Sequence, residues 1–162
     1  MGDGPVEGGV PDSAEGVPDA PGVVKRTNLQ DLGLRLVRAT AVHRNYIMST
    51  WVISAADAAA RRGIRRSLAR QREDDCAKLS YNDGLVYVLT DGVDDTVIHG
   101  WVAGKHGLLI WGYIPPELRH KGIFRAMVRQ VCGREVSYTR RPRGYKVPGW
   151  WVYDPYRITE FR

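Results

Sequence analysis

One stretch constrains the fold of this chain more than any other: between residues 108 and 132 an apolar run, two prolines, a basic glycine turn and a helical pattern follow one another directly. Pro115 and Pro116 lack backbone N–H donors and favour extended geometry in the preceding residue. The apolar run Leu108–Ile114 is therefore predicted to be a strand that ends there. A helix is predicted to begin near Leu118 or Arg119.

Three basic residues, Arg119, His120 and Lys121, stand before Gly122 in this stretch. They are expected in the first turn of the helix, where backbone amides lack intrahelical partners and the helix dipole favours anions. Gly122 would let a ligand approach the backbone closely. The stretch therefore predicts a phosphate-binding turn.

A simpler interpretation of the same stretch is an ordinary connection between a strand and a helix. Phe124, Met127, Val128 and Val131 recur at the spacing of a helix that faces a core. In this interpretation the prolines only end the strand and the basic residues are solvated.

The length of 162 residues favours one folded domain plus a tail. Residues 1–24 contain six glycines, four prolines, five acids and no lysine, arginine or aromatic residue. We expect a disordered acidic Gly/Pro-rich tail over residues 1–27 and a single domain over residues 28–162. All 24 lysines and arginines lie beyond residue 24 against 13 acids, so that part carries +11. This charge suits a phosphate-bearing ligand, a nucleic acid or an acidic partner.

Cys76 and Cys132 are the only cysteines, too few for a disulfide framework. No apolar run approaches the ~20 residues of a membrane span, and the start does not resemble a signal peptide. We expect a cytoplasmic protein that does not enter the membrane. No His/Cys set has zinc spacing, so no metal is expected.

Before residue 108 the pattern predicts a strand from Leu34 to Thr40 and a helix from His43 to Ala55, with Thr40 as a cap. A second helix, Asp57–Asp75, is rich in alanine and arginine. Its arginines four residues apart would form a basic flank, which is either solvated or paired with phosphates or carboxylates. Three strands follow, Leu85–Leu89, Thr96–Val102 and Leu108–Ile114, joined by Asp/Gly-rich turns.

The pattern Ile114-x-Pro116-x-x-Arg119-x-x-Gly122-Ile123 resembles the acyl-CoA pyrophosphate loop of the GNAT superfamily of N-acyltransferases, V-x-P-x-x-R/Q-x-x-G-x-G/A. Phe124 departs from the small residue that ends this pattern. The resemblance extends over about Leu34 to Cys132. The small size of the chain and its shortened C-terminal part are similar to those of compact phage-encoded members. It implies an α/β (α+β) fold with a central, mostly antiparallel mixed sheet flanked by helices. It also implies binding of acetyl-CoA or another acyl-CoA by Tyr113, Ile114, Arg119, His120, Lys121, Gly122, Ile123 and Phe124.

After Gly133 only 29 residues follow, where the family usually continues with a strand, a helix and two more strands. We expect a strand at Glu135–Thr139, splayed from Leu108–Ile114, then a basic loop, and a last strand in Trp150–Tyr156. The C-terminal part of the domain is thus shortened.

The resemblance implies acyl transfer from the thioester to an unidentified amine. A tyrosine beyond Glu135–Thr139 would protonate the leaving thiolate, and Tyr145 is favoured over Tyr138, Tyr153 and Tyr156. His99 or Glu135 would be the base. Both also have an ordinary structural explanation: His99 as a strand residue that faces solvent, and Glu135 as a surface acid.

Two other functions stay open on the residues alone. Phe124 and the shortened C-terminal part would suit a non-catalytic protein-binding module on a degenerate acyltransferase scaffold. A nucleic-acid-binding module would use cations to neutralise phosphates and Trp150 and Trp151 to stack on bases. The basic residues offered to an acidic protein or a nucleic acid are Arg61, Arg62, Arg65, Arg66, Arg140, Arg141 and Arg143.

Overall fold

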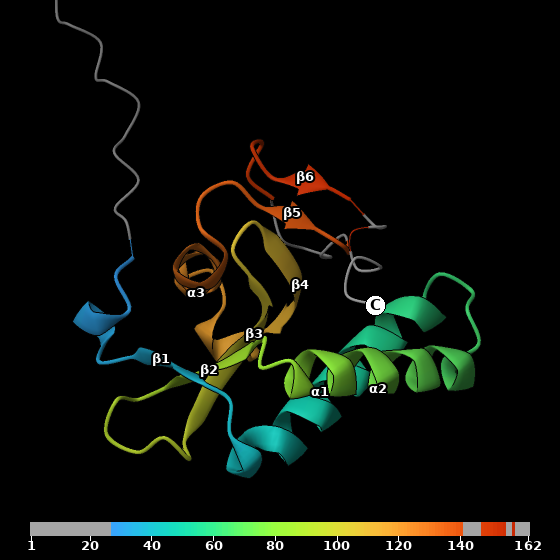
Figure 1. Cartoon of the computed structure of the whole chain (residues 1–162), viewed down its shortest axis with the longest axis horizontal. Helices are drawn as coiled ribbons and strands as arrows, with labels where there is room; N and C mark the ends of the chain where they lie inside the picture. The colour runs from blue at the N-terminus through green and yellow to red at the C-terminus, as the bar shows by residue number, and fades with distance from the viewer. Residues whose placement is uncertain (1–26, 141–146, 155–156, 158–162) are drawn as a thin grey trace, which may run out of the picture.

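The computed structural model of the chain describes residues 27–140, 147–154 and 157 (Figure 1). The α helices and 3-10 turns are η1 (Gln30–Leu32), η2 (Ala41–His43), α1 (Arg44–Ala60), α2 (Arg66–Asn82), η3 (Pro116–Leu118) and α3 (Ile123–Cys132). The strands are β1 (Arg35–Arg38), β2 (Val86–Thr90), β3 (Ile98–Lys105), β4 (Leu108–Tyr113), β5 (Ser137–Tyr138) and β6 (Val152–Tyr153).

The strands form one mixed sheet in the order β1-β2-β3-β4-β5-β6. The pairs from β1 to β4 are antiparallel, whereas β4–β5 and β5–β6 are parallel. The connection from β4 to β5 runs through α3, as a parallel pair requires. The prediction of an α+β fold with a mostly antiparallel mixed sheet flanked by helices is confirmed at this level.

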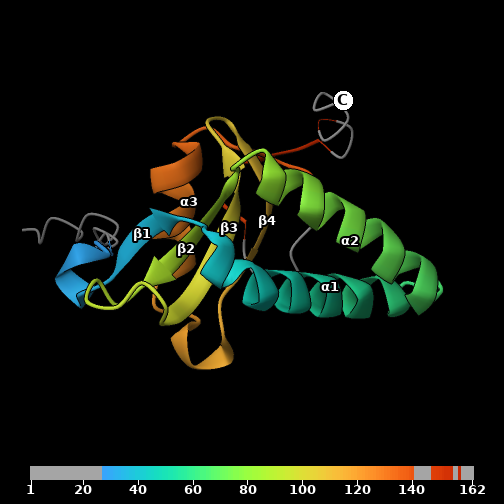
Figure 2. The same cartoon turned by 60° about the horizontal axis from the view of Figure 1, so that its bottom comes forward.

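Two apolar clusters, one on each face of the sheet, hold the helices in place. Figure 2 shows α3 on one side of the sheet and the α1–α2 pair on the other. Neighbouring strand residues point to opposite faces. Leu89, Val102 and Leu109 accordingly pack in the cluster that contains α3, while Val88, Trp101 and Ile110 pack in the cluster that contains α1 and α2. The sheet therefore lies between α3 and the α1–α2 pair.

The predicted helix Asp57–Asp75 is wrong in its bounds. The structure continues α1 to Ala60, turns through residues 61–65 and begins α2 at Arg66. Gly63 has a φ of 78°, which a helix does not tolerate and which glycine adopts at little cost. The turn folds α2 back beside α1, and both views show it at the end of the hairpin that lies away from the sheet (Figures 1 and 2).

Buried polar contacts fix the start of α1. His43 is 2% exposed; its Nδ1 accepts the backbone N–H of Thr40 at 2.9 Å, and its Nε2 lies 2.7 Å from the carbonyl oxygen of Asp95. Thr40 thus caps η2 rather than α1 directly. Further along α1, Trp51 stacks on Trp101 of β3 with ring centroids 5.0 Å apart. These contacts set the position of α1 on the sheet.

Across the described residues, none of the helices has both the length and the apolar character that crossing a lipid bilayer demands.

Candidate functional site

The candidate site begins where β4 ends. Pro115 is extended, with φ −60° and ψ 152°, and Pro116 opens the 3-10 turn η3. The amides of Leu118 and Arg119 donate to the carbonyls of Pro115 and Pro116 at 3.1 and 3.2 Å. The two prolines therefore end the strand as the sequence predicts and lead into a turn that points the chain toward α3.

The predicted start of the next helix near Leu118 or Arg119 is wrong, because α3 begins at Ile123. Arg119 is extended, and both His120 (φ 64°) and Gly122 (φ 75°) adopt left-handed geometry that interrupts a right-handed helix. The three cations thus lie in a turn ahead of the helix, not in its first turn. We call residues 119–123 the anion turn.

Side-chain bonds attach both ends of the anion turn to the body. Arg119 donates from Nε to the carbonyl of Ile114 at 2.9 Å, and Thr27 donates from Oγ1 to the carbonyl of Lys121 at 2.9 Å. A Cβ added to Gly122 would overlap the Thr27 hydroxyl. Gly122 is therefore required both for its positive φ and for the approach of Thr27, which occupies part of the space above it.

The anion turn still presents donors to solvent. Arg119, His120, Lys121 and Gly122 are all exposed. Of the backbone carbonyls in the described residues, none accepts a hydrogen bond from the amides of residues 120–123. The dipole of the ten-residue α3 adds partial positive charge at the same end. The arrangement is able to bind an anionic group through backbone N–H donors and the exposed basic side chains of Arg119 and Lys121.

The ring of Phe124 does not extend along the anion turn toward solvent. It packs on Gly112 of β4, where a Cβ would overlap the ring, and joins the apolar cluster on the α3 face. Glycine at 112 is thus explained by the bulk of Phe124. The side chain covers the backbone of β4 one residue before Tyr113.

Two tyrosines and a carboxylate meet at the end of β4 on the other face of the sheet. Tyr46 of α1 makes an edge-to-face contact with Tyr113, with ring centroids 6.5 Å apart. Burial, together with Tyr113 and the negative charge of Glu117, raises the pKa of Tyr46 above its usual value. Tyr46 is thus a weaker acid than an ordinary tyrosine, and its phenol stays protonated at neutral pH. Only the packing of α1 on the sheet places Tyr46 beside Tyr113.

The predicted catalytic residues are not brought together. His99 lies at the start of β3 and is half-buried. Glu135 is exposed just before β5, which pairs in parallel with the first residues of β4, so it lies at the opposite end of the strand from Tyr113. Tyr145 and Tyr156 lie outside the described residues. Tyr138 and Tyr153 contact each other, with ring centroids 5.4 Å apart.

The pairing of β4 with β5 is short, as the predicted splay requires. It covers Leu108 and Leu109, and Thr139 adds two bonds, from its amide to the carbonyl of Leu109 and from Oγ1 to that of Ile110. Within the described residues, β5 does not pair with β4 beyond this point. The last third of β4, up to Tyr113, therefore has described strand pairing only with β3.

Arg140 follows this divergence and turns inward. It forms an ion pair with Glu73 of α2, and its guanidinium lies 5.6 Å from the ring centre of Trp111. The second carboxylate oxygen of Glu73 accepts the indole N–H of Trp51 at 3.2 Å. This buried pair connects α2 to the end of β5, so Arg140 is not part of an exposed basic surface. Arg141 and Arg143 lie outside the described residues.

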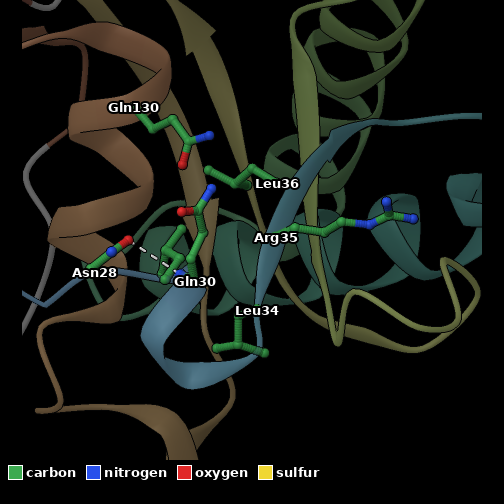
Figure 3. A pocket seen from close by; sticks show the side chains of 7 residues that line it. Asn28, Gln30, Leu34, Arg35, Leu36 and Gln130 are labelled. Carbon is green, nitrogen blue, oxygen red and sulfur yellow. Dashed lines mark hydrogen bonds between the residues drawn. The ribbon is translucent and has the colours of Figure 1, made fainter.

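An open hollow of about 420 Å³ lies between η1, β1 and α3. Figure 3 shows Gln130 of α3, Gln30 of η1 and Leu36 of β1 directed toward one another across it, whereas Arg35 points away and pairs with Asp95. None of the residues predicted to bind a cofactor lines it. The hollow is thus separate from the anion turn.

In the described part of the chain, no group of three or more His, Cys, Asp or Glu side chains is arranged to hold a metal ion.

Comparisons with protein-family models, curated proteins and solved structures gave no significant match.

Proposed function

We propose that this protein is an acyl-CoA-dependent N-acyltransferase of the GNAT type, which transfers the acyl group of acetyl-CoA or another acyl-CoA to an amine. The observation that carries the proposal is the anion turn at the end of β4. Its backbone amides at residues 120–123 donate to no backbone carbonyl among the described residues, and its Arg119 and Lys121 side chains are exposed. The order of elements supports it: a strand, two helices, three antiparallel strands, a helix, and a strand parallel to β4.

In this proposal the diphosphate of CoA binds at residues 119–123. Lys121 supplies charge, the His120 ring and the backbone amides supply hydrogen-bond donors, and the α3 dipole adds to both. Arg119 acts mainly by holding the turn against Ile114. The thioester end of the carrier would lie along the last third of β4, where β5 has diverged. Thr27 shares the space above Gly122, so binding requires the side chain of Thr27 to shift.

Acyl transfer then needs an oriented amine and a proton donor for the leaving thiolate. The amine nitrogen attacks the thioester carbonyl carbon, the carbon–sulfur bond breaks, and the sulfur leaves with a proton. Among the described residues we propose Tyr46 as this donor, because its phenol lies beside Tyr113 at the end of β4. Tyr145 remains the donor proposed from the resemblance. His99 remains a candidate to take the proton from the amine.

A thermal-shift titration with CoA tests the proposal. Ligand at about 100 times its Kd should stabilise the protein by about 2.7 kcal/mol, a rise of several degrees in Tm. Lys121→Glu should abolish the rise, because it reverses an exposed charge in the anion turn. Arg129→Glu makes the same charge change at the other end of α3 and should leave most of the rise. No shift of the wild type at about 1 mM CoA would contradict the proposal.

The second candidate is a non-catalytic binding protein on the same scaffold. It is favoured by Thr27, which occupies space above Gly122, and by Phe124, whose ring covers Gly112 of β4 beside the proposed path of the carrier. Phe124→Ala separates the two candidates. If the scaffold is catalytic, the smaller side chain should keep or tighten CoA binding. If neither the wild type nor Phe124→Ala binds CoA, the non-catalytic function is favoured.

A further inference from the structure

The turn between α1 and α2 carries a dense group of exposed cations that the proposed acyl transfer does not use. We define the arginine tip as Arg61, Arg62, Arg65, Arg66 and Arg70, all of them exposed. Among residues 57–70 these five arginines are opposed by a single acid, Asp57. Both views place the turn at the end of the hairpin away from the sheet (Figures 1 and 2). The tip is thus a projecting, strongly positive surface, separate from the anion turn.

The charges of the tip are largely unanswered within the described chain. Asp57 pairs with Arg66, and this contact is the main cause of the lowered pKa of Asp57. No ion pair joins Arg61, Arg62 or Arg65 to another described residue. Like charges at this density repel one another, and an external polyanion relieves that repulsion.

The composition of the tip favours phosphates over a protein surface. Protein interfaces do use arginine, but they combine it with aromatic anchors around a centre that is depleted of other charges. Residues 57–70 contain no aromatic side chain, and the exposed apolar side chains there are Ile64 (49%) and Leu68 (61%). Guanidinium groups pair with phosphate oxygens through two parallel hydrogen bonds. A convex basic tip fits a groove bordered by phosphates.

We propose that the arginine tip binds the phosphate backbone of double-stranded nucleic acid without reading its sequence. The absence of aromatic residues from 57–70 gives no platform for unstacked bases, so a duplex is favoured over a single strand. Of the two tryptophans expected to stack on bases, Trp151 is 9% exposed and packs beside Tyr138, while Trp150 is 62% exposed but is not part of the arginine tip. This inference is independent of the acyl-CoA site.

Fluorescence anisotropy with a labelled mixed-sequence DNA duplex of about 20 base pairs, two helical turns, tests the proposal. The wild type should bind at about 50 mM salt and weaken steeply toward about 200 mM. The triple variant Arg61→Gln, Arg62→Gln, Arg65→Gln should bind roughly tenfold or more weakly. The slope of its affinity against salt should shrink by about 0.9 for each phosphate that the variant no longer neutralises.

The matched control is Arg125→Gln, Arg129→Gln, Arg134→Gln, which removes three exposed positive charges on or after α3. This control should lose clearly less affinity than the tip variant. Equal losses in the two variants, or no binding of the wild type at about 50 mM salt, would overturn the proposal. The proposal would also be overturned if poly-L-glutamate displaced the duplex efficiently and the double variant Ile64→Ser, Leu68→Ser no longer bound the duplex. In that case the tip would be a surface for an acidic protein.

Discussion

Arg140 and the arginine tip show the same side chain in opposite settings. The Arg140 side chain is 20% exposed, pairs with a Glu73 side chain that is 9% exposed, and lies over Trp111. Arg61, Arg62 and Arg65 are exposed and have no described ion partner. A desolvated charge requires a partner, whereas a hydrated one does not. Arg140 therefore stabilises the fold, whereas the three tip arginines are available to bind a ligand.

The anion turn is intermediate between these settings. Arg119 bonds to the carbonyl of Ile114, while His120 and Lys121 remain exposed. A turn held at fixed points but open at its donors suits a small anion such as a diphosphate. The projecting tip suits an extended polyanion. Local fixation, rather than the number of cations, distinguishes the three regions.

The largest effect is expected from breaking the buried pair. Glu73→Leu leaves the Arg140 guanidinium and the Trp51 indole N–H without their acceptor. Loss of one partner of a buried pair costs about 3–5 kcal/mol. Urea unfolding followed by tryptophan fluorescence measures this loss of unfolding free energy.

The double variant Glu73→Leu, Arg140→Met serves as the control for this prediction. Replacing both charges with apolar groups should recover much of the stability, since no uncompensated charge remains. A single-variant loss below about 1 kcal/mol would show that solvent screens the pair as it does on a surface.

An intermediate effect is expected at the anion turn. Gly122→Ala combines a side chain at φ 75° with an overlap on Thr27, and should cost about 1–3 kcal/mol. Gly33→Ala is the matched control, because Gly33 has φ 68° but no heavy atom within 4 Å of a Cβ. The difference in unfolding free energy between the two variants reports the contact with Thr27. Equal losses would mean that Thr27 does not lie on the turn in solution.

The smallest effect on stability is expected at the arginine tip. The triple variant Arg61→Gln, Arg62→Gln, Arg65→Gln should change the free energy of unfolding by no more than about 0.5 kcal/mol, because these side chains are hydrated and make no described ion pair. Thermal melting at low salt tests this. A large loss would place these arginines in the same structural class as Arg140.

The sequence predicted the sheet well, because its signals are local. The apolar runs of β2, β3 and β4 and the prolines at 115 and 116 each act within a few neighbours. The strand after α3 and the short final strand were also predicted in approximate position. The helix boundaries failed where one residue adopted left-handed geometry: Gly63 splits α1 from α2, and His120 delays α3.

The contacts that shape the candidate site could not be predicted, because they join distant parts of the chain. Thr27 and Lys121 are 94 positions apart, and Glu73 and Arg140 are 67 apart. Arg140 was expected beside the exposed arginines because it opens a basic stretch of sequence, and the sequence does not show that its side chain turns inward to Glu73. The pairing of Tyr46 with Tyr113 likewise depends on how α1 packs on the sheet.

A ¹H–¹⁵N NMR titration of the full chain with CoA tests the central claim most directly. Binding of the diphosphate at the anion turn predicts saturable shifts of the His120–Ile123 amides, with a Kd below about 1 mM, that disappear in Lys121→Glu. Shifts confined to residues 61–70, or no shift of residues 120–123 at about 1 mM CoA, would contradict it.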